Sequence, residues 1–284
     1  MAGFRNVKGI TDAYEAGRFR TCSFRKVPAD TSVAGTWYDL SRSAGNPPPN
    51  YYATSPLVAA ALDPMRGIFH GDSVSPGALF LQELHVVTGT AGLVGQYKLL
   101  DYLLYYPFID LDDTDVQTMD NSLSLSRYED GAGVRAMLVA LTPTVGGGSF
   151  TFDYINQDGV QKTAPTQSCS VAAANIGTLV TSEQATAAGG QVFLKLASGD
   201  SGMRSIVSWQ MAVPNGGLGA LVLVRPIADI AIREVNTPAE VDFVRTHPNL
   251  PRIYDSAYLN LIVNCAATVA AGTLTGRADF IWSE

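Results

Sequence analysis

Apolar runs of strand length, separated by turn residues, recur along most of this chain. They span residues 78–87, 99–106, 134–141, 149–155, 192–196, 206–211, 218–225, 259–266 and 277–282. The clearest hairpin joins 149–155 to 160–163 through an Asn-Gln-Asp-Gly turn. In its first strand, Phe150, Phe152 and Tyr154 share one face. About ten short strands without regular strand–helix alternation predict an all-β fold, an antiparallel β-sandwich of the jelly-roll type.

Helical patterns are few and short. Residues 11–17, 54–62 and 238–244 each combine a capping residue or an opening proline with a few helix-forming residues. We therefore expect short helices at the periphery of the sandwich.

The composition is that of a folded chain with a sizeable core. Of the 284 residues, 46% are hydrophobic and only 16% are charged, which excludes disorder of the whole chain. No apolar stretch is long enough to span a bilayer, and the first residues lack a signal-peptide core. The net charge of −7 argues against general nucleic-acid binding. We expect neither a membrane nor a specific nucleic acid as a partner.

The N-terminal segment differs from the rest in charge. Residues 1–50 carry seven basic and four acidic side chains, whereas residues 51–284 carry 12 basic and 22 acidic ones. The segment ends in three prolines within 46–50, which predict an extended polyproline II spacer. We interpret 1–50 as an extended N-terminal arm or subunit-contact region and 51–284 as the sandwich body. An equally weighted alternative places one or two strands of the same domain in 1–50. The arm interpretation also predicts that removing residues 1–30 leaves the body folded.

Cysteines and histidines offer no recognisable site. Three isolated cysteines, Cys22, Cys169 and Cys265, lack metal-binding spacing and are expected to be reduced and buried. The histidines are His70, His85 and His247. No Gly-x-Ser-x-Gly sequence supplies a nucleophile, and no Walker A sequence occurs. We expect no enzyme activity, no catalytic residue, no cofactor and no metal site.

Acidic side chains concentrate in residues 101–130, which carry eight acids and one base. The densest group is Asp110, Asp112, Asp113 and Asp115. It departs from an EF-hand loop, because Asp115 stands where that loop needs glycine. The main interpretation is a solvated acidic loop, and cation binding stays open. The stretch could also pair with the basic segment of a neighbouring copy.

The chain has 12 tyrosines, several of them in groups. The grouped ones are Tyr51, Tyr52, Tyr102, Tyr105, Tyr106, Tyr254 and Tyr258. Tyrosine is enriched at protein interfaces, because it offers a large apolar area with a polar tip. Two interpretations remain: tyrosines of a sandwich core and rim, or tyrosines of a subunit contact.

Several stretches resemble virion structural proteins of tailed bacteriophages. They are residues 3–8 (GFRNVK), 36–41 (TWYDLS) with 45–47 (GNP), 101–108 (DYLLYYPF), 221–226 (LVLVRP) and 250–255 (LPRIYD). The resemblance implies a head cement or decoration protein that stabilises the capsid lattice. A tail, portal-vertex or host-recognition component is the alternative, and an enzyme of the particle is a third hypothesis.

The resemblance also implies partners and a location. The partners would be the major capsid protein or other virion proteins, together with further copies of this chain, most simply as a homotrimer. The protein would be part of the virion and would assemble in the bacterial host cytoplasm. The candidate partner-binding residues of the N-terminal segment are Phe4, Arg18, Arg20, Phe24, Arg25, Lys26 and Trp37. Their apolar members would supply most of the affinity, because exposed charge pairs contribute little.

Overall fold

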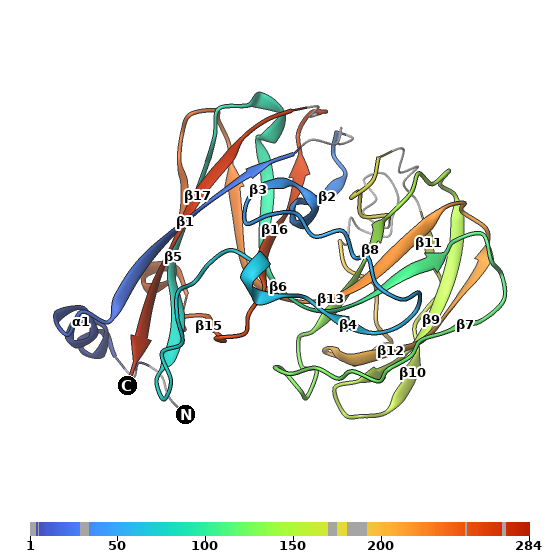
Figure 1. The fold of residues 1–284 in the computed structure, drawn as a ribbon, viewed down its shortest axis with the longest axis horizontal. Coiled ribbons are helices and arrows are strands. Elements are labelled where there is room, and N and C mark those ends of the chain that lie inside the picture. Colours follow the sequence, from blue (N-terminus) through green and yellow to red (C-terminus); the bar gives the residue numbers. More distant parts are fainter. Residues whose placement is uncertain are drawn as a thin grey trace.

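The computed structural model describes Phe4 and residues 6–28, 34–169, 175–180, 192–247, 249–268 and 271–284. This part consists mostly of antiparallel strands in three sheets, which confirms the predicted all-β class (Figure 1). The short helical elements within it are α1 (Val7–Glu15), α2 (Phe243–Thr246), η1 (Leu40–Arg42), η2 (Pro64–Arg66) and η3 (Ala91–Leu93). No helix among the described residues is long and apolar enough to cross a membrane.

A central sheet runs through the middle of the molecule (Figure 1). Its strand order is β2-β16-β6-β13-β8, and β4 pairs with β6. The strands are β2 (Trp37–Asp39), β16 (Leu259–Cys265), β6 (Gly95–Asp110), β13 (Leu218–Ile232), β8 (Arg135–Ala140) and β4 (Ala60–Ala61). The two longest, β6 and β13, pair with each other along nearly their whole length.

Two further sheets lie at opposite ends of these long strands. The first, which we call the terminal sheet because it holds the first long strand and the last, has the order β14-β5-β17-β1-β3, with β15 paired to β5. Its strands are β14 (Ala239–Asp242), β5 (Ala78–Thr88), β17 (Leu274–Ser283), β1 (Phe19–Val27), β3 (Ala44–Asn46) and β15 (Arg252–Ile253). The second, the distal sheet, has the order β10-β9-β12-β7, with β11 paired to β9. Its strands are β10 (Gln161–Thr163), β9 (Gly148–Asn156), β12 (Met203–Val213), β7 (Gln117–Thr118) and β11 (Gln167–Cys169).

Each outer sheet encloses its own hydrophobic core with the central sheet. The core beneath the terminal sheet takes Tyr97, Leu99, Ile230 and Ile232 from the long strands. The core beneath the distal sheet takes Leu104, Tyr106, Leu221 and Leu223 from the same two strands. A third cluster contains residues of the central sheet such as Leu100 and Val222, covered by Tyr52, Leu62 and Leu179. The fold is therefore two sandwiches that share one sheet.

Bulges allow one pair of strands, β6 and β13, to contribute side chains to two hydrophobic cores. Register shifts interrupt the β6–β13 pairing at three places. One shift follows Pro226, which has no amide hydrogen to give to the ladder. Bulges bend a strand and increase its twist, so the long strands can turn from one core to the next.

The described residues of the segment 1–50 do not form an extended arm. Strand β1 pairs with β17 on one side and with β3 on the other, so it is an interior strand of the terminal sheet. Strand β2 pairs with β16 of the central sheet. The alternative that places strands of the same domain in this segment is the one observed. The segment folds inward because Cys22 and Phe24 alternate with polar residues and complete the core beneath the terminal sheet, the terminal core.

Three smaller predictions are wrong, and backbone hydrogen bonds to distant segments of the chain explain two of them. Residues 54–62 form turns and β4 instead of a helix, because the Leu57 and Ala59 amides donate to carbonyls of Pro107 and Asp120. The segment 238–244 begins as β14, which pairs with β5 before α2 follows. The described residues of 192–196 form no strand.

Candidate functional site

The outer face of the terminal sheet carries a compact group of charged side chains. Along β5 and β17, side chains alternate between the terminal core and this outer face. Helix α1 covers one end of the face, where Phe4 and Ile10 pack on Phe80 and Ile281. Beyond α1 lie eight polar side chains that we call the polar ladder. They are Thr21, Ser23, Glu83, His85, Glu240, Asp242, Arg277 and Asp279.

Strand register places the polar ladder in two rows across the sheet. In one row, Arg277 and Glu240 lie on either side of His85 as direct cross-strand partners. In the other row, Asp279 and Asp242 flank Glu83 in the same way. Side chains directly opposite one another on one face of a sheet are close enough to interact. The rows therefore set charged groups of both signs side by side.

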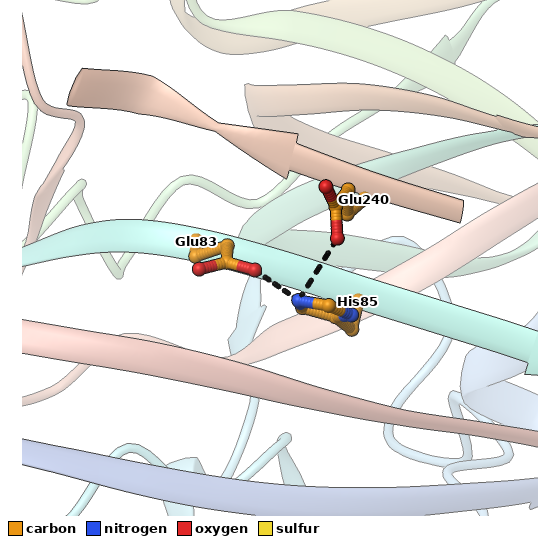
Figure 2. A group of neighbouring side chains, drawn as sticks. All are labelled: Glu83, His85 and Glu240. Atoms are coloured by element: carbon orange, nitrogen blue, oxygen red, sulfur yellow. Dashed lines mark hydrogen bonds and ion pairs between the residues drawn. The ribbon is translucent and has the colours of Figure 1, made fainter. Parts of the chain in front are cut away.

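Three members of the ladder converge on one point (Figure 2). His85 Nε2 contacts a carboxylate oxygen of Glu83 and lies 3.6 Å from Glu240 Oε2. Glu83 and His85 are two residues apart on β5, and Glu240 reaches across from β14. Their nearest ligand atoms all lie within 4.8 Å of one another. Glu83 and His85 are partly buried, whereas Glu240 is exposed.

Arg277 borders this group on the opposite side. Its guanidinium lies 3.0 Å from His85 Nε2 and 3.7 Å from the Glu83 carboxylate. It also forms an ion pair of 3.3 Å with Asp279. The arginine therefore supplies positive charge beside the carboxylates of Glu83 and Asp279.

The structure buries three of the seven candidate partner-binding residues, which corrects the prediction for them. Phe24 belongs to the terminal core, and Trp37 belongs to the third cluster, which contains residues of the central sheet. The Lys26 side chain is buried, and its ammonium group donates to the carbonyls of Ser43 and Pro47. Burial lowers the pKa of Lys26 to about 8. A partner could reach Phe24 and Lys26 only if the sheet opened, whereas Trp37 lines an open surface pocket with Lys98 and Asp229.

Three of the other four candidates contact their own chain, and Arg20 lies on the side of β1 that also carries Cys22 and Phe24. Phe4 packs against the Phe80 ring, Arg18 pairs with Glu284, and Arg20 donates to the carbonyl of Asp72. Arg25 is exposed on β1. Contacts of these residues with a partner stay a prediction.

Several carboxylates of the acidic stretch, residues 101–130, are bound by other groups of the same chain. Asp101 is buried and forms a bidentate ion pair with Arg127, so it cannot belong to a surface patch. Asp110, Asp112 and Asp113 accept hydrogen bonds from backbone amides within two residues or from the facing Gly216. Such bonds are typical of turns. The carboxylates thus shape the loop that follows β6.

Most grouped tyrosines belong to the core. Tyr52, Tyr102, Tyr105, Tyr106 and Tyr258 are buried, whereas Tyr51 is 58% exposed. The core interpretation therefore holds for these five. The buried hydroxyls of Tyr52 and Tyr102 both donate to the Asp39 carboxylate.

Sequence reasoning named His85 but not the residues around it. The alternation of Glu83 and His85 within a predicted strand was the available signal, because it places both on one face. Glu240 and Arg277 come from segments far along the chain, and only the strand order brings them to His85.

Comparison with known proteins identifies no relative. No family model matches the chain, and no curated protein matches it. Among solved structures, the VP2 subviral particle of infectious bursal disease virus is 10% identical, with 93% of this chain and 80% of that chain covered and a TM-score of 0.16. The T=1 particles derived from the same virus are 9% identical, with coverage of 93% and 77% and a TM-score of 0.16. Similarity this weak does not establish a common fold.

Proposed function

We propose that this chain is a structural protein of a bacteriophage particle, and that it binds the head lattice as a cement or decoration protein. The proposal joins the sequence resemblance to one structural observation, the outer face of the terminal sheet. This face is built on five paired strands, so it is broad and its side chains are held in fixed positions. A protein that stabilises a lattice needs a surface of this kind.

The make-up of the face supports the proposal. The polar ladder presents both charge signs, which suits recognition of a complementary charged surface. Beside it, the rings of Tyr14 and Phe19 lie 4.8 Å apart and are 37% and 48% exposed. An exposed apolar area next to polar groups resembles the core and rim of protein interfaces. Phe19 would thus provide apolar contact area, and the ladder would provide specificity.

The surface that would bind the lattice differs from the extended arm that the sequence predicts. With β1 folded into the sheet, the exposed side chains of this strand, Phe19 and Arg25 among them, would meet the lattice directly. The expectation of a homotrimer rests on the sequence resemblance alone. Light scattering of the purified chain tests it.

Binding to particles assembled without this chain tests the function. Purified wild-type chain should sediment with such heads and protect them against heat. Arg25→Glu and Phe19→Ser, both on the exposed side of β1, should reduce occupancy. Lys162→Glu, an exposed charge reversal on the distal sheet, is the matched control and should bind as wild type. Binding confined to the tail or portal vertex would support the alternative component, and absence of binding would contradict both.

A further inference from the structure

The geometry points to a divalent metal site on the outer face of the terminal sheet, in which Glu83, His85 and Glu240 bind a zinc-type cation. The chemistry of the donors fits this class of metal. Imidazole nitrogen and carboxylate oxygen are both ligands of Zn²⁺ and similar first-row ions. Ca²⁺ prefers six or more oxygen ligands, and Mg²⁺ prefers an octahedral set of oxygens. We therefore expect selectivity for zinc over both.

One pair of ligand atoms has the separation expected of a tetrahedral site. Bonds of about 2.0–2.2 Å to Zn²⁺ place neighbouring ligand atoms roughly 3.3–3.6 Å apart. His85 Nε2 and Glu240 Oε2 are 3.6 Å apart. Glu83 approaches the same nitrogen more closely, so a small rotation of its side chain would open room for the ion. Figure 2 shows both carboxylates directed at this nitrogen.

Strand pairing fixes the backbone positions of the ligands. His85 and Glu240 are direct cross-strand partners, and β5 lies between β14 and β17 in the sheet. Ligands on paired strands are held more precisely than ligands on loops. Three protein ligands would leave a fourth position open on the solvent side, as at zinc sites that also hold water.

Arg277 competes with the metal for the Glu83 carboxylate and for His85 Nε2. Its guanidinium is 3.7 Å from Glu83 and would be repelled by a cation bound at His85. Asp279 offers it another partner at 3.3 Å, so the arginine can remain paired while the metal binds. The inference therefore makes a second prediction, that removal of the Arg277 charge strengthens binding.

Calorimetric titration of the full chain with ZnCl₂, after dialysis against a chelator, tests the site. We expect one zinc per chain, no comparable binding of Mg²⁺ or Ca²⁺, and a higher melting temperature with zinc. His85→Gln and Glu240→Gln should each weaken zinc binding at least about tenfold, since even outer-shell changes often cost this much. Arg277→Gln should bind zinc more tightly than wild type.

Matched controls separate this site from adventitious zinc binding. His247→Gln and Glu234→Gln alter an exposed histidine and an exposed glutamate away from the ladder and should leave the affinity unchanged. Circular dichroism should show the same β spectrum for all variants, because the changed side chains lie outside the cores. Absence of saturable zinc binding, or equal affinities in wild type, His85→Gln and Glu240→Gln, would overturn the site. None of these outcomes depends on whether the chain binds a phage head.

Discussion

At the scale of single residues, Asp39 is the centre of a buried hydrogen-bond network in the central sheet. The Asp39 carboxylate is fully buried and accepts hydrogen bonds from Tyr52, Tyr102 and both the amide and the hydroxyl of Ser41. An unpaired buried carboxylate would be strongly destabilising, whereas a fully bonded one fixes its neighbours in place. The network therefore fixes η1 and the loop to Tyr52 against the central sheet.

Removal of one partner from the buried ion pair of Asp101 and Arg127 should destabilise the fold far more than removal of one partner from an exposed pair of the polar ladder. The Arg127 side chain is only 6% exposed, and it also donates to the Tyr102 carbonyl. We expect Arg127→Ala to lower the free energy of unfolding by about 3–5 kcal/mol, because Asp101 would stay buried and unpaired. Arg277→Ala, at a half-exposed pair, should cost below about 1 kcal/mol. Urea denaturation measures both, and equal losses would contradict the structure.

The buried tyrosines predict a loss of stability in alkali. Burial raises the pKa of Tyr106 to about 12 and the pKa values of Tyr52 and Tyr102 well above 10. Their neutral forms are favoured in the folded state, so this stability is fully present below pH 10. Between pH 10 and 12 the unfolded chain loses these protons while the folded chain keeps them. The free energy of unfolding should then fall by up to about 1.4 kcal/mol per pH unit for each such tyrosine.

Tyrosinate absorbance at 295 nm, followed with circular dichroism, measures this effect. We expect the buried tyrosines to ionise together, at the pH where the β spectrum is lost. Gradual ionisation of all tyrosines near pH 10, with the fold retained, would show that the rings are accessible.

At the scale of elements, β1 and α1 differ in what they contribute. Strand β1 lies between β17 and β3 and supplies Phe24 to the terminal core. Helix α1 adds only a small cluster on the outer face. Deletion of residues 1–16 should therefore leave a cooperatively folded protein of reduced stability, whereas deletion of residues 1–28 should abolish the fold.

Near-ultraviolet circular dichroism and thermal melting of the two truncations distinguish these outcomes. A sharp melting transition after deletion of residues 1–28 would restore the arm interpretation, in which this segment is dispensable for folding. Loss of the transition after deletion of residues 1–16 would show that α1 is needed as well.

Most strands could be predicted from the sequence, because their alternation reflects burial on a sheet. The hairpin of β9 and β10 has the predicted turn, and β5, β8, β12, β16 and β17 lie where the apolar runs predict them. The sequence did not predict that β6 and β13 each continue past one core into another. A continuous apolar run looks the same whether it crosses one core or two, and Pro226 suggests an end where the structure has a bulge.

The polar ladder was harder to predict than the strands that carry it. The pairing of Glu240 with His85 follows from β14 joining the edge of the terminal sheet, and a segment predicted as helix gave no sign of this. Likewise, the burial of Lys26 could not be anticipated, because lysine is seldom buried and the accepting carbonyls of Ser43 and Pro47 lie on a different segment.

At the scale of the whole molecule, one sheet joins two sandwiches into a single body. Both cores include side chains of β6 and β13, so neither sandwich can separate without breaking these strands. We expect such a body to transmit load between its two ends without bending at a linker. That property suits a protein that holds neighbouring subunits of a particle together.

Cryo-electron microscopy of particles produced with and without this chain tests the proposed function most directly. The account predicts difference density at regular positions on the outer surface of the head. The three-sheet body should fit this density with the outer face of the terminal sheet against the lattice, and heads without the chain should open at a lower temperature. Difference density restricted to the tail or portal vertex, or none at all, would contradict the cement function.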